Sequence, residues 1–326
     1  MRTRALTVLI LVAAVTPVTA VPAAAQGSPV GGVGHVYFVS GAGNPTGEAV
    51  AWFVYGDPHD EVYVGDFVDR AGWLPGDGRD ELMVRRGNWF VVRGGDPAGF
   101  HYGDPGDVVL VGDWDGDGRD TLAVRRGNEF HLRNALSDGP ADLVVAYGDP
   151  GDTVHVGNWD AGENGPGTWS AVTTDTLMVQ RGNRFHVAND LEAEVADYEF
   201  GFGDPGDTVL VGDWATPPVL GTPVAPRRND PYGVQRGAYP DGADQLAVRR
   251  GNVYHQSGEL WQVEDTGADP GTVRTLVYGD PGDTALVMAA EYTYSTAEGL
   301  HTLLGDGLAV RRPWQASDDR LLPPRG

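Results

Sequence analysis

The chain has 326 residues, no cysteine and a formal net charge of −23, with 46 acidic against 23 basic side chains. The absence of cysteine excludes disulfide bonds, thiolate metal sites and cysteine catalysis. A chain this acidic is expected to repel nucleic acids and anionic lipids, because binding to phosphates depends on Lys and Arg. We therefore expect no nucleic-acid partner and an affinity for divalent cations.

The first 25 residues have the pattern of a secretory signal peptide. Arg2 and Arg4 provide a positive start, residues 5–15 an apolar core, and residues 23–25 an Ala-Ala-Ala cleavage motif. We predict export by the general secretory route and removal of residues 1–25. No later apolar stretch approaches the twenty residues of a membrane-spanning helix, so we expect no membrane span.

A repeated phrase organises the remainder of the chain. The sequence Gly-Asp-Pro-Gly-Asp follows Tyr102, Tyr147, Phe202 and Tyr278, and an altered copy follows Tyr55. The first three copies are 47 and 45 residues apart. Self-similarity at this period indicates a propeller or a solenoid, in which each unit buries its apolar faces against its neighbours.

Each complete unit contains four predicted strands. In the clearest copy these are an apolar run at 108–111, a second at 122–125, an alternating run at 129–133 and a fourth at 143–147. Gly-Asn at 127–128 signals a tight hairpin between the second and third strands. Four strands in a unit of about 46 residues match one propeller blade.

The two ends of the mature chain are half units. Residues 35–39 and 50–54 correspond to strands three and four, whereas residues 284–287 and 308–312 correspond to strands one and two. A straight solenoid would leave each half with an exposed sheet edge. A closed ring instead combines the halves into one blade, which makes five blades in total.

We therefore predict an all-β protein, a five-bladed β-propeller closed by its terminal half-blades. The predicted organisation is a signal peptide at 1–25, a short linker at 26–34, the propeller at 35–312 and a C-terminal tail at 313–326. We expect no helix after the signal peptide, because no later segment has helical periodicity.

One segment carries a family resemblance. Residues 111–124, Val-Gly-Asp-Trp-Asp-Gly-Asp-Gly-Arg-Asp-Thr-Leu-Ala-Val, resemble an FG-GAP or VCBS-type repeat of integrin-like β-propellers. The resemblance extends over residues 35–312. It implies that the loop between the first two strands of a blade binds calcium, and that the protein has an adhesion, lectin or accessory role.

The residues of this loop suit calcium independently of the resemblance. Calcium takes six to eight hard oxygen ligands, and Asp113, Asp115 and Asp117 can converge on one ion. The backbone carbonyl of Arg119 could add a further oxygen. The family pattern closes with an aspartate where this chain has Thr121, while Asp120 lies one residue earlier, so the closing ligand is left open between them. The alternative is an acidic hairpin loop that binds no metal.

The corresponding loops of the other units are eroded. They retain Asp66, Asp77 and Asp80 in the first unit, Asn158, Asp160 and Asp175 in the third, Asp213, Asp241 and Asp244 in the fourth, and little beyond Asp306 in the fifth. We interpret these as turn-forming residues, because isolated aspartates commonly stabilise turns through their own backbone. We therefore predict one calcium site, and count the other loops as degenerate candidates.

All long insertions fall on one side of the ring, which we call the variable face. They connect strands one and two, or three and four, at residues 68–76, 161–173, 215–240, 256–274 and 289–305. Loops on a rigid scaffold commonly carry recognition. We predict that ligand binding uses aromatic residues of these insertions, namely Trp73, Trp169, Tyr232, Tyr239 and Trp261. The alternative is that each aromatic residue only packs its own insertion onto the blade.

The opposite side, which we call the constant face, repeats the same turns in every unit. Asp104 and Asp107 are expected to pair with Arg125 or Arg126 across neighbouring blades, and their copies likewise. We favour this structural role, because repeat packing requires the same residues in every unit. The alternative is a set of repeated sugar pockets.

We expect a secreted, monomeric, non-catalytic binding or adhesion module whose partner is an extracellular protein or glycan. The alternatives are a lectin with repeated pockets and a purely structural extracellular propeller. A glycoside hydrolase is less favoured, because no catalytic motif is found and nothing singles out one pair among the many carboxylates.

Overall fold

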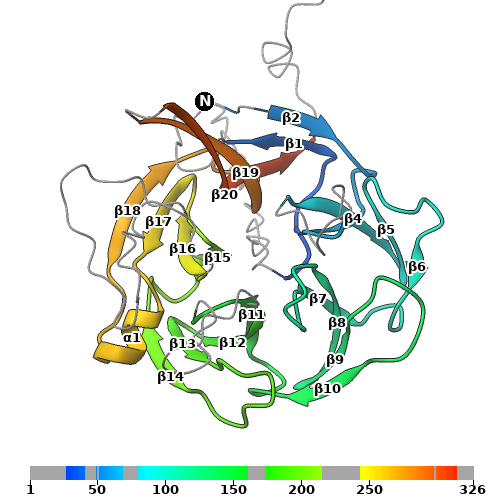
Figure 1. Cartoon of the computed structure of the whole chain (residues 1–326), viewed down its shortest axis with the longest axis horizontal. Helices are drawn as coiled ribbons and strands as arrows, with labels where there is room; N and C mark the ends of the chain where they lie inside the picture. Colours follow the sequence, from blue (N-terminus) through cyan, green and yellow to red (C-terminus); the bar gives the residue numbers. More distant parts are fainter. Residues whose placement is uncertain are drawn as a thin grey trace, which may run out of the picture.

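The computed structural model describes residues 27–40, 49, 51–68, 79–160, 174–214, 243–296 and 299–313. Within these residues, five four-stranded antiparallel sheets form a ring around a central axis (Figure 1). The predicted all-β, five-bladed propeller is confirmed.

The blades follow one another along the chain, and we number them from the first complete one. Blade 1 is β3 (Glu61–Gly65), β4 (Glu81–Arg86), β5 (Trp89–Val92) and β6 (Phe100–His101). Blade 2 is β7 (Val108–Gly112), β8 (Thr121–Arg126), β9 (Glu129–Arg133) and β10 (Leu143–Ala146). Blade 3 is β11 (Thr153–Gly157), β12 (Thr176–Arg181), β13 (Arg184–Val187) and β14 (Tyr198–Gly201). Blade 4 is β15 (Thr208–Gly212), β16 (Gln245–Arg250), β17 (Val253–Ser257) and β18 (Thr272–Val277). Blade 5 is β19 (Thr284–Thr296), β20 (Gly299–Arg312), β1 (Val36–Val39) and β2 (Ala51–Val54).

Blade 5 combines the two ends of the chain, as the half-unit offset predicts. β1 pairs with β20 in antiparallel register, with Val36 opposite Arg312 and Val39 opposite Ala309. The hydroxyl group of Tyr278 also donates a hydrogen bond of 3.0 Å to the carbonyl oxygen of Phe38. The ring is therefore closed by strand pairing and leaves no half-blade edge at this junction.

The apolar core is divided into five clusters, one between each pair of neighbouring blades. Between blades 1 and 2, for example, Met83 and Phe90 pack against Val109 and Leu122. The second strands are buried on both faces, because one face of a blade contacts the preceding blade and the other face contacts the next. This explains the continuous apolar runs in the sequence.

The repeated Gly-Asp-Pro-Gly-Asp phrase forms the turn that leads into each blade. In blade 2, the amide of Asp104 donates to the Asp107 carboxylate at 2.9 Å, and the amide of Asp107 donates to the Asp104 carbonyl at 3.1 Å. Gly103 has φ of 63°, and a Cβ atom there would lie 2.7 Å from a methyl group of Val124. Glycine is required at this position for both reasons.

The second arginine of each Arg-Arg pair forms ion pairs within its own blade. Arg126 lies 2.7 Å from carboxylate oxygens of both Asp104 and Asp107. Its hydrogen bond holds the pKa of the Asp107 carboxyl below its usual value. The prediction that these ion pairs link neighbouring blades is wrong, because both partners flank the first two strands of one blade. The same arrangement recurs at Arg86, Arg181, Arg250 and Arg312.

The first arginine of the pair makes the contact between blades. Arg125 donates to the carbonyl oxygens of Asp152 and Asp149, at 2.8 and 3.0 Å, in the turn that begins blade 3. Successive residues of a strand point to opposite faces, so the two arginines serve different partners. Equivalent contacts to the next turn are made by Arg85, Arg249 and Arg311.

The boundary between blades 3 and 4 lacks this arginine. Gln180 takes its place and donates instead to Gly182 of its own hairpin at 2.7 Å. Its other partner is the ring of His155, at 2.9 Å, which occupies the position of a leucine in blades 2 and 4. The described hydrogen bonds of Gln180 therefore remain inside blade 3.

A second repeated contact is also missing at this boundary. In the turns before blades 2 and 3, the hydroxyl groups of Tyr102 and Tyr147 donate to the third strand of the blade, at 2.8 and 3.1 Å. Phe202 occupies the same position before blade 4 and has no hydroxyl group. The boundary therefore depends more on apolar packing than its neighbours do.

A short helix strengthens the same boundary. α1 (Trp261–Thr266) lies in the connection between β17 and β18, so the expectation of no helix is wrong at this one place. Val263 packs into the cluster between blades 3 and 4, and Asp269 accepts a 2.7 Å hydrogen bond from the amide of Gly201 in β14. The helix ends at Gly267 in the left-handed conformation, with φ of 66°.

The buried histidine predicts a measurable acid sensitivity. Burial lowers the pKa of His155 from 6.5 to about 4, so between these values the unfolded chain takes up a proton that the folded protein does not. Stability is therefore lost as the pH falls through this window. We expect His155→Leu to reduce the loss between pH 7 and pH 5 by about 2 kcal/mol, measured by urea unfolding. An equal loss in the wild type and the variant would contradict this assignment.

Candidate metal centre

The loop between β7 and β8 lies at the variable-face end of blade 2. Gly116 and Gly118 have φ of 71° and 86° and allow the tight path of the loop. Asp113, Asp115 and Asp117 each place a carboxylate oxygen so that the three oxygens lie within 4.8 Å of one another. These three are the alternating aspartates that the sequence singles out.

Backbone amides organise the loop around its first aspartate. The two carboxylate oxygens of Asp113 accept hydrogen bonds of 2.8 Å from the amides of Gly116 and Gly118. The carboxylate of Asp117 accepts a bond of 2.9 Å from the amide of Arg119. The carboxylates are therefore held in place by the loop itself.

The three carboxylates also repel one another. Burial raises the pKa of Asp113 to about 6, and the charges of Asp117 and Asp115 add to this effect. Burial and the charge of Asp117 likewise raise the pKa of Asp115. A divalent cation at their centre would offset this repulsion.

The other predicted ligands are arranged differently. Thr121 is buried at the start of β8, with its hydroxyl group 3.5 Å from the carbonyl oxygen of Gly112. The carboxylate of Asp120 accepts a 2.8 Å hydrogen bond from the amide of Asp66 in blade 1. The structure therefore brings together three of the predicted ligands, and engages Asp120 in a contact between blades.

The donor set fits calcium better than a transition metal. Three carboxylates at alternate positions, with glycine directly after the third, match the order of ligands in oxygen-only calcium loops. The chain has no cysteine, and the cluster contains no histidine, so soft or imidazole ligands are not part of it. Asp113, Asp115 and Asp117 would hold the ion, with backbone carbonyl groups and water completing its coordination.

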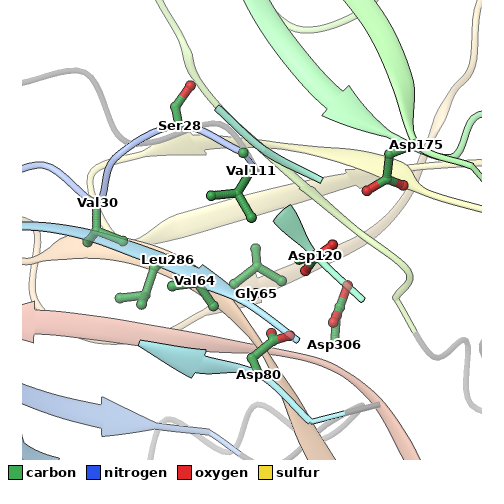
Figure 2. Close-up of a pocket in the computed structure, with 12 residues that line it drawn as sticks. Ser28, Val30, Val64, Gly65, Asp80, Val111, Asp120, Asp175, Leu286 and Asp306 are labelled. Atoms are coloured by element: carbon green, nitrogen blue, oxygen red, sulfur yellow. The ribbon is translucent and has the colours of Figure 1, made fainter. Parts of the chain in front are cut away.

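A second set of carboxylates surrounds the axis of the propeller. One aspartate lies two residues before the buried leucine of the second strand in every blade. It directly precedes the strand in blades 1 to 4 and lies within β20 in blade 5: Asp80, Asp120, Asp175, Asp244 and Asp306. Figure 2 shows four of them around a cavity of about 60 Å³, together with apolar side chains of the innermost strands. We call these five residues the axial ring.

Each member of the axial ring connects two blades. Its carboxylate accepts a hydrogen bond from an amide of the preceding blade, which lies just beyond the first strand in blades 1 to 4 and within β19 in blade 5. The donors to Asp120, Asp175, Asp244, Asp306 and Asp80 are Asp66, Asp113, Asn158, Asp213 and Ala289, at 2.6 to 2.9 Å. The interpretation as local turn formers is wrong for Asp80, Asp175, Asp244 and Asp306, because their partners lie in another blade.

The carboxyl groups of the axial ring have raised pKa values, because burial and mutual repulsion disfavour their ionisation. Burial raises the pKa of Asp80 and of Asp175 to about 7. Burial, followed by repulsion from Asp175 and Asp306, also raises the pKa of Asp244 well above its usual value. The sequence does contain a signal for the ring, since an aspartate recurs two residues before the buried leucine of each second strand. Each of these aspartates is, however, more than fifty residues away in the sequence from the amide that it binds.

The predicted aromatic ligand-binding residues fall mostly outside the described part of the chain. Trp73, Trp169, Tyr232 and Tyr239 lie outside it. Trp261 is the first residue of α1, and its side chain is likewise outside the description. The insertion at 289–305 is largely a hairpin, in which β19 and β20 continue their pairing from Ala289↔Asp306 to Thr296↔Gly299.

Comparison of the chain with protein-family models, curated proteins and solved structures finds no match. Among the described residues, none of the helices is long and apolar enough to cross a membrane.

Calcium is expected to stabilise the folded protein. Binding to the loop should raise the melting temperature in millimolar calcium relative to chelator, because an ion that binds only the folded state stabilises it. Asp115→Ala should remove most of this increase. The measurement is a thermal melt followed by circular dichroism, with and without calcium.

The matched control for this experiment is Asp96→Ala. Asp96 is likewise an aspartate in a turn, and its carboxylate accepts a hydrogen bond of 2.8 Å from an amide two residues later. It lies outside the candidate metal loop. This variant should retain the full response to calcium. Identical melting curves of the wild-type protein with calcium and with chelator would show that the loop is an ordinary acidic turn.

The axial ring predicts opposite effects for two substitutions of one residue. Asp244→Ala removes the acceptor of the buried Asn158 amide, and should cost about 1–3 kcal/mol. Asp244→Asn keeps an acceptor and removes a carboxylate that resists ionisation in the folded state. At pH 7 this variant should be at least as stable as the wild type.

The difference in the free energy of unfolding between Asp244→Asn and the wild type should shrink as the pH approaches 4. The raised pKa of Asp244 lowers stability only above the pKa of the unfolded chain, where the unfolded state has lost its proton and the folded state retains it. Urea unfolding at pH 7 and pH 4 measures both effects. Equal destabilisation by Asn and Ala at pH 7 would contradict the assignment.

Proposed function

We propose that this protein is a secreted, non-catalytic binding or adhesion module built on an FG-GAP/VCBS-like propeller. In this proposal, calcium bound by Asp113, Asp115 and Asp117 stabilises blade 2. Recognition of an extracellular protein or glycan lies on the variable face. The partner is neutral or cationic, because removal of residues 1–25 would leave a net charge of −25.

The contrast between the two faces is the observation that carries the proposal. On the constant face, every copy of the turn binds its aspartates to an arginine of the same blade, as Arg126 does with Asp104 and Asp107. These charged groups are engaged in the fold, which argues against repeated sugar pockets built from them. The long connections instead all leave and re-enter the blades on the variable face, where each differs from the others.

The arrangement of the strands supports a scaffold role for the blades. β3 and β4 of blade 1 pair in full register from Glu61↔Arg85 to Gly65↔Glu81, although an insertion joins them. β15 and β16 of blade 4 do the same across a longer insertion, from Thr208↔Arg249 to Gly212↔Gln245. Insertions of different length are therefore tolerated without disturbing the pairing, as is typical of binding loops on a rigid framework.

A panel of purified polysaccharides tests the proposal. The panel should contain neutral glucans, cationic chitosan and anionic hyaluronate, with extracellular-matrix proteins in a second set. We expect saturable binding to a neutral or cationic member. Trp169→Ala or Trp261→Ala should lower the affinity at least fivefold, about 1 kcal/mol.

Trp89→Ala is the matched control for these variants. Trp89 begins β5, next to the constant-face hairpin, and donates to the carbonyl oxygen of Ala98 at 2.9 Å. This variant should bind normally. Loss of binding in Arg250→Ala or Asp204→Ala, with binding unchanged in the Trp169 and Trp261 variants, would place recognition on the constant face. That result would favour a lectin with repeated pockets.

A further inference from the structure

The N-terminal segment of the described chain lies inside the ring of blades. Residues 27–34, which we call the axial segment, occupy the stretch predicted to be a short linker. The amide of Val30 donates to the carbonyl oxygen of Val62 in β3 at 2.6 Å. The amide of Val111 in β7 donates to the carbonyl oxygen of Gly27 at 2.7 Å. The segment therefore contacts the innermost strands of blades 1 and 2.

A buried arginine holds the same segment from blade 5. Arg311 is 1% exposed and donates to the carbonyl oxygens of Gly34 and Val30, both at 2.9 Å, and of Gly31 at 3.3 Å. Its remaining guanidinium nitrogen donates to the carbonyl oxygen of Asp60 in the turn of blade 1. The equivalent arginines of blades 1, 2 and 4 make the same contact to the next blade. Three acceptors for a fully buried cation are therefore supplied by the axial segment.

The fit of the segment is selective for residue size. Val30 is 3% exposed and packs with Val62 and Leu286 in the cluster between blades 5 and 1. Gly27 and Gly32 have φ of 84° and 76°. A Cβ atom on Gly27 would lie 2.7 Å from the carbonyl oxygen of Val111, and one on Gly32 would overlap the hydroxyl group of Thr284. Gly34 has no room for a Cβ atom either, because the Arg312 carbonyl group lies against it.

The body of the propeller thus holds the segment as a bent peptide, with one isolated antiparallel bridge between Val30 and Val62. Recognition uses backbone groups of the segment, one apolar side-chain pocket and three positions that admit only glycine. Main-chain hydrogen bonds combined with a few side-chain pockets are a common mode of peptide recognition. We propose that the axial channel is a peptide-binding site, and that residues 27–34 are its resident intramolecular ligand.

The axial ring gives this site a direction. Gly27 and Ser28 line the same cavity as Asp80, Asp120 and Asp306, and Figure 2 shows Ser28 and these aspartates on different sides of it. The amino end of a peptide bound like the axial segment therefore borders a cavity that carboxylates also line, whereas its carboxyl end lies near Arg312 and Pro58. The preferred ligand is a peptide that follows the same path, with a free amino group, glycine at the positions of Gly27, Gly32 and Gly34, and a valine-sized residue at that of Val30.

The peptide site is tested by displacing the axial segment in a variant and adding a synthetic peptide of the same sequence. The full chain carrying Val30→Asp places a charge in the apolar pocket, which should unseat its own segment and lower the melting temperature. A synthetic peptide with the sequence of residues 27–34, Gly-Ser-Pro-Val-Gly-Gly-Val-Gly, should bind this variant saturably and raise its melting temperature. The wild-type chain should not respond, because its tethered segment has a high effective concentration at the site.

Three matched peptides sharpen the result. Replacing the valine that corresponds to Val30 with aspartate, or the glycine that corresponds to Gly32 with alanine, should abolish binding. Acetylating the amino terminus should weaken binding severalfold, as measured by isothermal titration calorimetry. Equal binding of the acetylated and free peptides would overturn the assignment of the amino end to the axial ring.

Failure of the unmodified peptide to bind the folded Val30→Asp variant would overturn the peptide site itself. Equal binding of the alanine-substituted peptide would do the same, because it would show that the bound segment does not follow the path of the axial segment. If Val30→Asp does not fold, Val30→Ala is measured under the same criteria. It weakens the pocket contact without burying a charge.

Discussion

Every blade of this propeller has two apolar faces, and each face must be covered by a different neighbour. The four consecutive buried residues at the start of β8, β12 and β16 show how little of a blade is left for solvent. A single blade would expose both faces, so it gains little stability before its neighbours are in place. Because the ring closes through the pairing of β1 with β20, the blade formed from the two chain ends completes two of the five apolar clusters.

Polar contacts between and within blades add to this apolar packing in two places, near the constant face and at the axis. Near the constant face, one arginine of each pair locks the turn of its own blade and the other reaches the carbonyl groups of the next turn. At the axis, the carboxylates of the axial ring accept an amide from the preceding blade. The boundary between blades 3 and 4 shows that these contacts can be exchanged. There Gln180 and Phe202 replace the usual arginine and tyrosine, and α1 adds apolar contacts in compensation.

Asp113 of the candidate calcium loop is hydrogen-bonded to Asp175 of the axial ring. The backbone of Asp113 exchanges two hydrogen bonds with Asp175 of blade 3, at 2.8 and 2.9 Å, while its side chain organises the loop of blade 2. A cation held by that side chain would therefore stabilise the end of β7 and the boundary between blades 2 and 3 together. The charge of Asp113 also contributes to the raised pKa of Asp175.

The sequence by itself determined the strand order of the blades, their number and the closure of the ring, since these follow from a period and from the half units at each end. It also determined the cluster of Asp113, Asp115 and Asp117, whose members are close in the chain. It did not determine the partners of Asp120, Asp175 and their copies, nor which arginine of each pair crosses to the next blade. The path of residues 27–34 through the channel could not be predicted either, because nothing in a Gly-rich stretch indicates burial. Only the tertiary structure decided these features, because each depends on groups that ring closure brings together from distant parts of the chain.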